Sequence, residues 1–369
     1  MSKLLSSGKR ALLIIAFSAI SIAFINANFF QITNDKGELV REIVHSKYLE
    51  NTVTKESPDR YVSIYLPPSY RKSEGKRYPV LYLLHGIAGT DKNWTIPWSN
   101  NSLATISEIM DHGISSGKFG EMIVVMPDQK TNWFGSFYTN SSVTGQWEDF
   151  TTEELVNYID TKYRTLDKPQ SRGIAGHSMG GYGALMLAMK HPDVFSATYG
   201  LSSALIDFDG GFSINSDAHK NAVDARSFAE LSKDNDLHTM AIVTISQAFS
   251  PNPHNPPFYA DLPMKKVDGK MVINPDGYNR WIEKSPIRLV KKYQDNLKRL
   301  SAIALDAGDK DEFPIVVLNS RAYSNELKKY NIDHIYDEYS GNHRDGLWGA
   351  SGRIYNNVLP FFWEILERN

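Results

Sequence analysis

The sequence predicts an α/β fold with a mostly parallel central sheet, helices on both of its faces and an inserted cap region. Three observations support this prediction. Short, almost continuous apolar runs, typical of strands buried on both faces, alternate with helical segments. A stretch of alternating polarity that ends in two prolines precedes them, as expected of an antiparallel strand. One long interval, residues 205–286, breaks the alternation.

The expected strands begin with an antiparallel pair at residues 39–48 and 60–68. In the second of these, Val62, Ile64 and Leu66 alternate towards one side. The apolar runs that follow are expected to be parallel strands, at residues 78–84, 122–126, 173–175, near Ser202, 301–307 and 332–339. Helices are expected between and after them, at residues 151–163, 181–190 and 352–368.

Two of the remaining segments carry particular signals. Thr151 and Glu154 have the spacing of a capping box, which predicts that a helix begins at Thr151. Residues 205–286 show no regular pattern and hold a cluster of prolines between residues 251 and 263. A long irregular stretch in a compact domain is usually a functional insertion. We interpret it as a cap over the active end of the sheet; the alternative is a peripheral decoration.

The composition is that of an ordinary globular protein. Of the 369 residues 41% are hydrophobic, and 40 Lys and Arg against 42 Asp and Glu give a net charge of −2, which argues against a nucleic-acid partner. The chain has no cysteine, which excludes disulfides, thiolate metal sites and a cysteine nucleophile. We expect residues 28–369 to form a single domain that includes the insertion.

The first 27 residues have the order of a secretory signal peptide. Lys3, Lys9 and Arg10 form a positive head, residues 11–25 are apolar, and Ala27 offers a small residue for cleavage. Loss of these three cations would change the net charge from −2 to −5. We expect export to the periplasm or the extracellular space. The alternative is an uncleaved N-terminal membrane anchor, although a span needs about 20 apolar residues.

A candidate nucleophile lies between two glycines. Gly176-His177-Ser178-Met179-Gly180 matches G-x-S-x-G, with an apolar strand before it and a helix after it. The sharp turn holds the serine in a strained conformation, and glycines two positions away on either side avoid a clash. The turn exposes the hydroxyl and aims the N-terminus of the helix at a developing oxyanion. Ser178 is therefore the predicted nucleophile; the alternative is a glycine-rich turn with an incidental serine.

A serine nucleophile needs a base, and an acid that orients the base. In this arrangement both follow the serine, first the acid and then the histidine. His343 is the predicted base because it lies in a loop just after the last expected strand. The strand over residues 301–307 ends in four candidate acids, Asp306, Asp309, Asp311 and Glu312. A calcium loop is the alternative use of these acids, but Pro314 stands where such a loop would need its glycine.

These motifs resemble those of the esterase D family of α/β-hydrolases, which includes feruloyl esterases, S-formylglutathione hydrolases and mycolyltransferases. The matching segments stand in the family's order over about residues 59–363, apart from the insertion: Leu83-Leu84-His85-Gly86, Trp147-Glu148-Asp149-Phe150, the motif around Ser178, Gly308-Asp309-Lys310-Asp311 and Gly341-Asn342-His343. The resemblance implies the α/β-hydrolase fold. It also implies that the acid is Asp311, the aspartate of G-x-x-D; Asp309 is the alternative.

The oxyanion hole is expected to consist of backbone N–H groups, one from Met179 and one from Ile87 or nearby. We expect His85 to be a buried histidine that bonds to local backbone and shapes this loop, not a base. The sequence contains no zinc, dinucleotide-binding or P-loop motif, and hydrolysis of an ester by a serine triad needs no metal or other cofactor.

The sequence therefore predicts an exported serine esterase that works through an acyl-enzyme. Its substrate would be a small or polymer-linked ester, and the likeness to feruloyl esterases implies hydroxycinnamoyl or short acyl esters. The candidate substrate-binding residues are aromatic: Trp94, Phe258, Tyr259 and Trp281. Two alternatives stay open: an acyltransferase that uses the same triad, and a non-catalytic binding module on a hydrolase scaffold.

Overall fold

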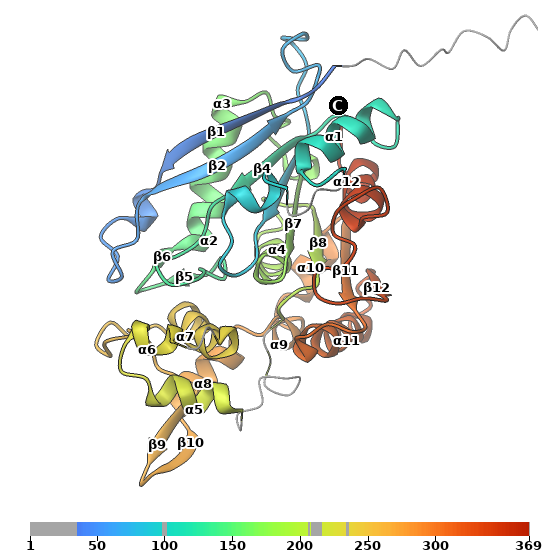
Figure 1. Ribbon diagram of the computed structural model, residues 1–369. Coiled ribbons are helices and arrows are strands. Elements are labelled where there is room, and N and C mark those ends of the chain that lie inside the picture. Colours follow the sequence, from blue (N-terminus) through green and yellow to red (C-terminus); the bar gives the residue numbers. More distant parts are fainter. Residues whose placement is uncertain (1–34, 98–101, 206, 208–215, 234–235, 369) are drawn as a thin grey trace, which may run out of the picture. The chain divides into compact units, whose positions relative to one another are not determined.

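The computed structural model describes residues 35–97, 102–205, 207, 216–233 and 236–368 (Figure 1). All of them belong to the second of the two units into which the chain divides, residues 35–369. The predicted signal peptide, residues 1–27, lies outside the described residues. Within the described ranges, no helix has both the length and the apolar character that crossing a bilayer requires.

An eight-stranded sheet forms the centre of this unit, in the order β1-β2-β4-β3-β7-β8-β11-β12. β1 (Glu38–His45) and β2 (Asp59–Leu66) are antiparallel to each other, and β2 is antiparallel to β4 (Ile123–Pro127). The other strands run parallel: β3 (Val80–Leu84), β7 (Arg172–His177), β8 (Ala197–Leu201), β11 (Ala302–Gly308) and β12 (Ile335–Tyr339). The predicted mostly parallel sheet with an antiparallel edge is therefore confirmed.

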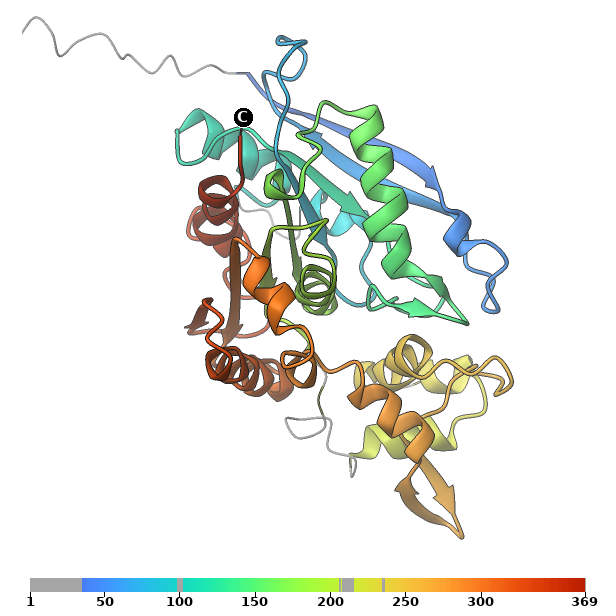
Figure 2. The same ribbon diagram turned by 180° about the vertical axis from the view of Figure 1, so that it is seen from behind.

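Helices cover both faces of the sheet, as Figures 1 and 2 show. α3 (Val156–Lys162), α4 (Met179–Lys190) and α11 (Pro314–Lys329) pack on one face, and α1 (Ile106–Ser115) and α12 (Leu359–Ile365) on the other. The strands supply side chains to the two cores in turn. In β3, Tyr82 and Leu84 belong to the core that includes α4, whereas Leu81 and Leu83 belong to the core that includes α1. Burial on both faces explains the continuous apolar runs.

The predicted capping box at Thr151 is wrong. The helical segment begins earlier, at α2 (Trp147–Asp149), and continues through a π-helical turn (Phe150–Leu155) into α3. The Thr151 hydroxyl donates to the carbonyl of Trp147, while Glu154 accepts from residues that follow β1. A threonine inside a helix can bond to the preceding turn in this way, so its spacing from a glutamate does not by itself mark a helix start.

The final helix also differs from the expectation over residues 352–368. A π-helical turn (Ile354–Val358) opens it, and the α-helical part, α12, is only the segment Leu359–Ile365. The helix after the G-x-S-x-G motif is closer to its expected range, residues 181–190, since α4 begins at Met179 and ends at Lys190.

The insertion between β8 and β11 is mostly regular structure, although its sequence shows no clear pattern. Its described elements are α5 (Asp217–Asp224), α6 (Phe228–Ser232), α7 (Leu237–Phe249), the hairpin β9 (Met264–Val267) and β10 (Lys270–Ile273), and α8 (Pro275–Ile282). Then α9 (Pro286–Leu289) and α10 (Gln294–Arg299) lead back to β11. Among the described residues, two hydrogen bonds join α7 to segments outside the insertion: Ser141 Oγ donates to the carbonyl of Gln247 at 2.6 Å, and Trp133 Nε1 to that of Met240 at 3.3 Å.

Candidate active site

Ser178 stands at the turn between β7 and α4 with φ +58° and ψ −117°. This is a strained conformation for a residue with a side chain, and such strain persists only where the surroundings hold the backbone. The Ser178 N–H donates to the carbonyl of Leu201 at 2.9 Å, and its own carbonyl accepts from the N–H groups of Tyr182 and Ala204 at 3.0 Å each. The turn from strand to helix is therefore built as the G-x-S-x-G motif predicts.

The two glycines of the motif are needed because backbone lies against them. A Cβ on Gly176 would lie 2.3 Å from the carbonyl oxygen of Gly180, and one on Gly180 would lie 2.2 Å from the carbonyl oxygen of Leu84. Both distances are far below van der Waals contact, and a backbone atom cannot rotate away. The absence of side chains thus lets the turn pass tightly over the end of β3.

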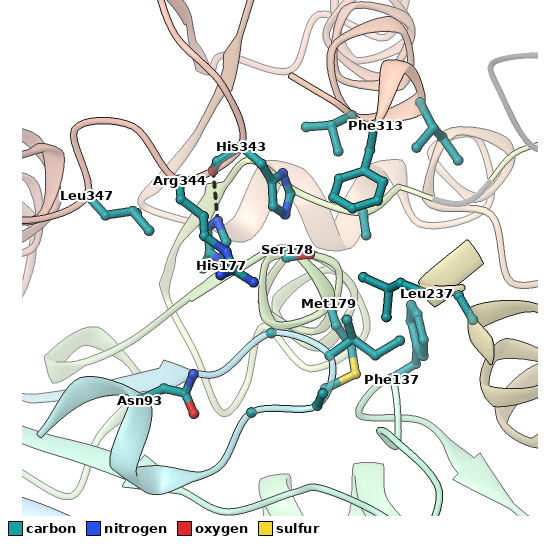
Figure 3. A pocket seen from close by; sticks show the side chains of 18 of the residues that line it. Asn93, Phe137, His177, Ser178, Met179, Leu237, Phe313, His343, Arg344 and Leu347 are labelled. Carbon is teal, nitrogen blue, oxygen red and sulfur yellow. Dashed lines mark hydrogen bonds between the residues drawn. The ribbon is translucent and has the colours of Figure 1, made fainter. Parts of the chain in front are cut away.

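His343 and Asp311 meet at the wall of the same cavity that Ser178 lines. His343 Nδ1 lies 2.7 Å from Asp311 Oδ2, and the other carboxylate oxygen accepts from the N–H of Phe313 at 2.8 Å. Both side chains are buried. Figure 3 shows the His343 ring pointing towards Ser178. Because a carboxylate can only accept, Nδ1 carries the proton and Nε2 is left as the basic nitrogen.

The other three candidate acids have different partners. Asp309 is exposed and accepts from the N–H of Gly341 at 3.0 Å, whereas Glu312 accepts from the N–H of His343 at 3.0 Å. Asp306 is buried in an ion pair with Arg353. Asp311 alone among the four bonds to the His343 ring, and the carboxylates diverge to separate partners instead of converging on one cation.

Two buried histidines support these loops. His85 Nδ1 donates to the carbonyl of Gly86 at 2.8 Å, and Nε2 accepts from the N–H of Gln129 at 2.9 Å, so the predicted role of a backbone-bonded histidine is confirmed. Burial lowers the pKa of His85, which suits this neutral tautomer. Sequence reasoning missed His177, which bonds to the carbonyl of His343. It occupies a variable position of the motif, so no sequence signal marks it.

The two residues expected to form the oxyanion hole lie beside Ser178. Met179 is the first residue of α4, where an N–H has no partner within the helix. Ile87 lines the cavity in the loop after β3. A Cβ on its neighbour Gly86 would lie 3.4 Å from the Cβ of Ser178, so this loop passes directly over the serine.

The cavity has a volume of about 420 Å³ and lies at the carboxyl ends of β3, β7 and β12. The loop after β3, α7, the start of α11 and the loop after β12 form its wall. From α7 come four lining residues that sequence reasoning missed, Leu237, His238, Ala241 and Ile245. Their spacing is helical, but α7 is apolar on almost every side, so its pattern did not distinguish the face that meets the cavity.

Of the four predicted substrate-binding residues, Trp94 lines the cavity. The other three, Phe258, Tyr259 and Trp281, are not among the described residues of the wall, and their part in substrate binding stays a prediction. Trp281 is buried inside the insertion, where its Nε1 donates to Ser250 Oγ at 3.2 Å, and Phe258 packs against Phe228. These two aromatic side chains are thus part of the packing inside the insertion.

A family model described as "Putative esterase" matches residues 56–351. The chain belongs to this esterase family. An esterase of Mycobacterium tuberculosis is 32% identical over 170 residues, which are 41% of this chain and 34% of that protein. An endo-1,4-beta-xylanase/feruloyl esterase of Xylanibacter ruminicola is 30% identical over 160 residues, 42% of this chain and 21% of that protein. The family member described here thus spans less than half the length of these curated relatives.

Solved structures confirm the α/β-hydrolase fold of this esterase-family chain. A ferulic acid esterase superposes with a TM-score of 0.61 at 22% identity, covering 90% of this chain and 100% of the other. An S-formylglutathione hydrolase from Agrobacterium tumefaciens gives a TM-score of 0.56 at 18% identity, covering 91% of this chain and 98% of the other. At such low identity these likenesses concern the fold.

Proposed function

We propose that this protein is a serine carboxylic-ester hydrolase that uses Ser178, His343 and Asp311. The observation that carries the proposal is the 2.7 Å contact of His343 Nδ1 with Asp311 Oδ2 at the wall of the cavity that Ser178 also lines. A buried carboxylate in this position holds the imidazole in one tautomer and stabilises the imidazolium that forms when Nε2 takes a proton. The strained turn at Ser178 supports the same function, and so does the membership of the chain in an esterase family.

The proposed reaction has two steps. Ser178 Oγ attacks the ester carbonyl carbon while its proton passes to His343 Nε2, and the N–H groups of Met179 and Ile87 stabilise the oxyanion. The carbon–oxygen bond to the alcohol then breaks, and the alcohol leaves with the proton from His343. Water attacks the acyl-enzyme in the same way, releasing the carboxylic acid and restoring the serine hydroxyl.

We propose hydroxycinnamoyl or short acyl esters as the substrate class. Aromatic side chains line the cavity on several sides, namely Trp94, Phe137, Phe313 and Trp348. A cavity of about 420 Å³ is large enough for an acyl group of this size. The name of the X. ruminicola relative includes feruloyl esterase, which supports this choice.

We also propose export directed by residues 1–27, as their order of charged, apolar and small residues indicates. Fractionation of cells that express the full chain, followed by N-terminal sequencing, tests this. A new N-terminus after Ala27 in the exported fraction is expected. An intact N-terminus in the membrane fraction would indicate an anchor, and an intact one in the cytosol would contradict export.

The function is tested with the variant Ser178→Ala on a panel of p-nitrophenyl esters from acetyl to hydroxycinnamoyl. We expect kcat to fall by about 10⁴-fold while the thermal unfolding midpoint stays unchanged. Ser115→Ala, half-buried at the C-terminal end of α1 and outside the cavity wall, is the matched control and is expected to keep its activity. Full activity of Ser178→Ala would contradict the assignment, and acyl transfer to an added alcohol that outruns hydrolysis would show an acyltransferase instead.

A further inference from the structure

We propose that Tyr339 is a positioning residue for the proposed reaction. Its hydroxyl group joins the segment that supports Ser178 to the loop that carries His343, and so holds the base where it can pass a proton to the leaving alcohol. The inference deepens the proposed function and rests on it. It is carried by a cluster of polar side chains around this hydroxyl group.

The cluster lies where three neighbouring strands of the sheet end. Ser202 directly follows β8, Asp306 lies near the end of β11, and Tyr339 is the last residue of β12; Figure 1 shows these strands side by side. Arg353, directly before the last π-helical turn, completes the cluster. Tyr339 is half-buried and the other three residues are buried. None of the four is among the described residues of the cavity wall, so they can affect the reaction only through other residues.

The Tyr339 hydroxyl group has a single hydrogen to donate, and its neighbours decide where that hydrogen points. Arg353 Nη2 lies 2.9 Å from the hydroxyl oxygen, and a guanidinium can only donate. The carbonyl oxygen of Asn342 lies at 2.7 Å and can only accept. Tyr339 therefore accepts from Arg353 and donates to Asn342, the residue directly before His343. This bond ties the end of β12 to the loop that carries the base.

The same hydroxyl group also contacts the segment that supports the nucleophile. Ser202 Oγ lies 3.0 Å from the Tyr339 hydroxyl oxygen and is the donor, because the tyrosine hydrogen is already used. Directly before Ser202 stands Leu201, whose carbonyl accepts from the N–H of Ser178. Two residues after Ser202 stands Ala204, whose N–H donates to the Ser178 carbonyl. One hydroxyl group thus touches the supports of both the nucleophile and the base.

A buried ion pair holds the serine and the tyrosine of the cluster in place. Arg353 Nη1 donates to Asp306 Oδ1, and the same carboxylate oxygen accepts from the N–H of Ser202 at 3.1 Å. The Arg353 guanidinium also lies over the Tyr339 ring, 3.9 Å from its centroid. Hydrogen bonds to charged groups are stronger than neutral ones, above all where water is excluded. The ion pair therefore fixes Ser202 and Tyr339 relative to each other.

The position of His343 matters most for the proton that the leaving alcohol needs. In the proposed reaction Nε2 takes the Ser178 proton and then gives it to the alcohol oxygen. An alkoxide is a strong base and leaves only with that proton, whereas 4-nitrophenolate is stable as an anion and leaves without it. A displaced His343 should therefore slow the cleavage of an alkyl ester more than that of a nitrophenyl ester.

The variant Tyr339→Phe tests this on the ethyl and 4-nitrophenyl esters of butyrate and of ferulate, using the acid that wild type releases faster. The variant keeps the ring and loses the hydroxyl group. We expect kcat/KM to fall by about tenfold more for the ethyl ester than for the nitrophenyl ester, because a hydrogen bond to the His343 loop is lost. The loss for the ethyl ester should lie in kcat, with KM within about twofold of wild type. A smaller folded fraction would lower both esters alike and leave their ratio unchanged.

Tyr336→Phe is the matched control on the same strand. Its hydroxyl group donates to Glu338 Oε1 at 2.6 Å, so this variant also loses a tyrosine hydrogen bond, but not one to the His343 loop. The ratio of the two esters should stay that of wild type. If Tyr339→Phe does not fold, as judged by its thermal unfolding, Ser202→Ala decides instead. It removes the contact on the nucleophile's side and should shift the ratio in the same direction.

The outcomes separate this inference from the proposed function. A ratio in folded Tyr339→Phe equal to that of wild type overturns the inference while the esterase function stands, and an unchanged ratio in Ser202→Ala does so where Tyr339→Phe does not fold. A wild type that cleaves only the nitrophenyl esters also overturns it, since His343 then gives no proton to an alkoxide. If wild type and Ser178→Ala show the same negligible rates on all four esters, the proposed function itself fails.

Discussion

His177 Nε2 bonds to the main-chain carbonyl of His343 at 3.0 Å, and the two imidazole rings lie 4.6 Å apart. His177 ends β7, directly before the nucleophile, and His343 lies in the loop after β12. This contact therefore links the strand that leads to Ser178 with the loop that carries the proposed base. Burial, followed by the charge of His343, keeps the pKa of His177 well below its usual value. His177 therefore stays neutral and does not oppose the protonation of its neighbour.

This contact predicts that His177 positions the base. His177→Phe keeps a ring of similar size but loses the hydrogen bond, and we expect kcat to fall by about tenfold with little change in KM. The acidic limb of the pH profile of kcat, which reports the His343 base, should also shift, which a purely structural defect would not cause. Steady-state kinetics from pH 5 to 9 check this, and a profile identical to that of wild type would refute the positioning role.

The two aspartates of the loop after β11 are expected to behave differently. Asp311→Asn replaces the carboxylate that bonds to His343, so kcat should fall by about 10³- to 10⁴-fold. Asp309→Asn, the matched control, keeps an oxygen that can accept from Gly341 and should cost less than about tenfold. The measurement is kcat on p-nitrophenyl butyrate; equal losses in the two variants would leave Asp311 without its proposed role.

Gly180→Ala tests the tight turn beneath Ser178. Its new Cβ would lie 2.2 Å from the carbonyl oxygen of Leu84, so backbone must move, at a cost of about 1–3 kcal/mol in the free energy of unfolding. We expect a lower midpoint of thermal unfolding and a lower kcat. At Gly75 a Cβ would meet nothing within 4 Å, so Gly75→Ala should leave both quantities unchanged. A Gly180→Ala variant as stable and active as wild type would show that the turn tolerates side chains.

The apolar wall of α7 is expected to limit the acyl chain. Ala241→Phe places a ring in the cavity, so kcat/KM for octanoyl esters should fall by at least about tenfold more than that for acetyl esters, because each buried CH₂ contributes about 0.8 kcal/mol. Leu318→Phe, exposed on α11 and outside the cavity wall, is the control. If both variants keep the wild-type order of chain lengths, α7 does not contact the acyl chain.

Stability is expected to depend on pH through His219 of α5. Burial lowers the pKa of His219 to about 4, whereas the unfolded chain has its ordinary value of about 6.5. The unfolded state therefore binds more protons between these values. The free energy of unfolding contributed by this residue is present above pH 6.5 and is lost as the pH falls towards 4.

Between pH 7 and pH 5, His219 should lower the free energy of unfolding by about 2 kcal/mol. Urea unfolding of wild type and His219→Gln at both pH values measures it, and the variant should lose about 2 kcal/mol less than wild type over the same interval. The other buried groups, among them His85, His177 and Asp306, are common to both proteins and cancel in the comparison. Equal losses in the two proteins would contradict the lowered pKa of His219.

Features that depend on a few neighbouring residues could be predicted from the sequence. A strand buried on both faces must be apolar throughout, so β3, β4 and β7 are readable as continuous runs. The turn at Ser178 needs glycines on either side because backbone crosses there, and His343 follows directly on a strand. By contrast, the helices of the insertion are short and mutually packed, and their pattern reflects partners far along the chain. The prediction of a capping box at Thr151 failed for a similar reason, since Glu154 bonds to residues after β1.

The mostly parallel sheet, the turn that carries Ser178 and the loop that carries His343 could therefore be predicted from the amino-acid sequence, because each is specified by local sterics and burial. Three further features became known only from the packing of the whole unit: Asp311 and not Asp309 bonds to His343, His177 lies beneath His343, and α7 and not Trp281 lines the cavity. These outcomes depend on how loops and helices distant in the chain pack together, and such long-range contacts leave no periodic trace in any one segment.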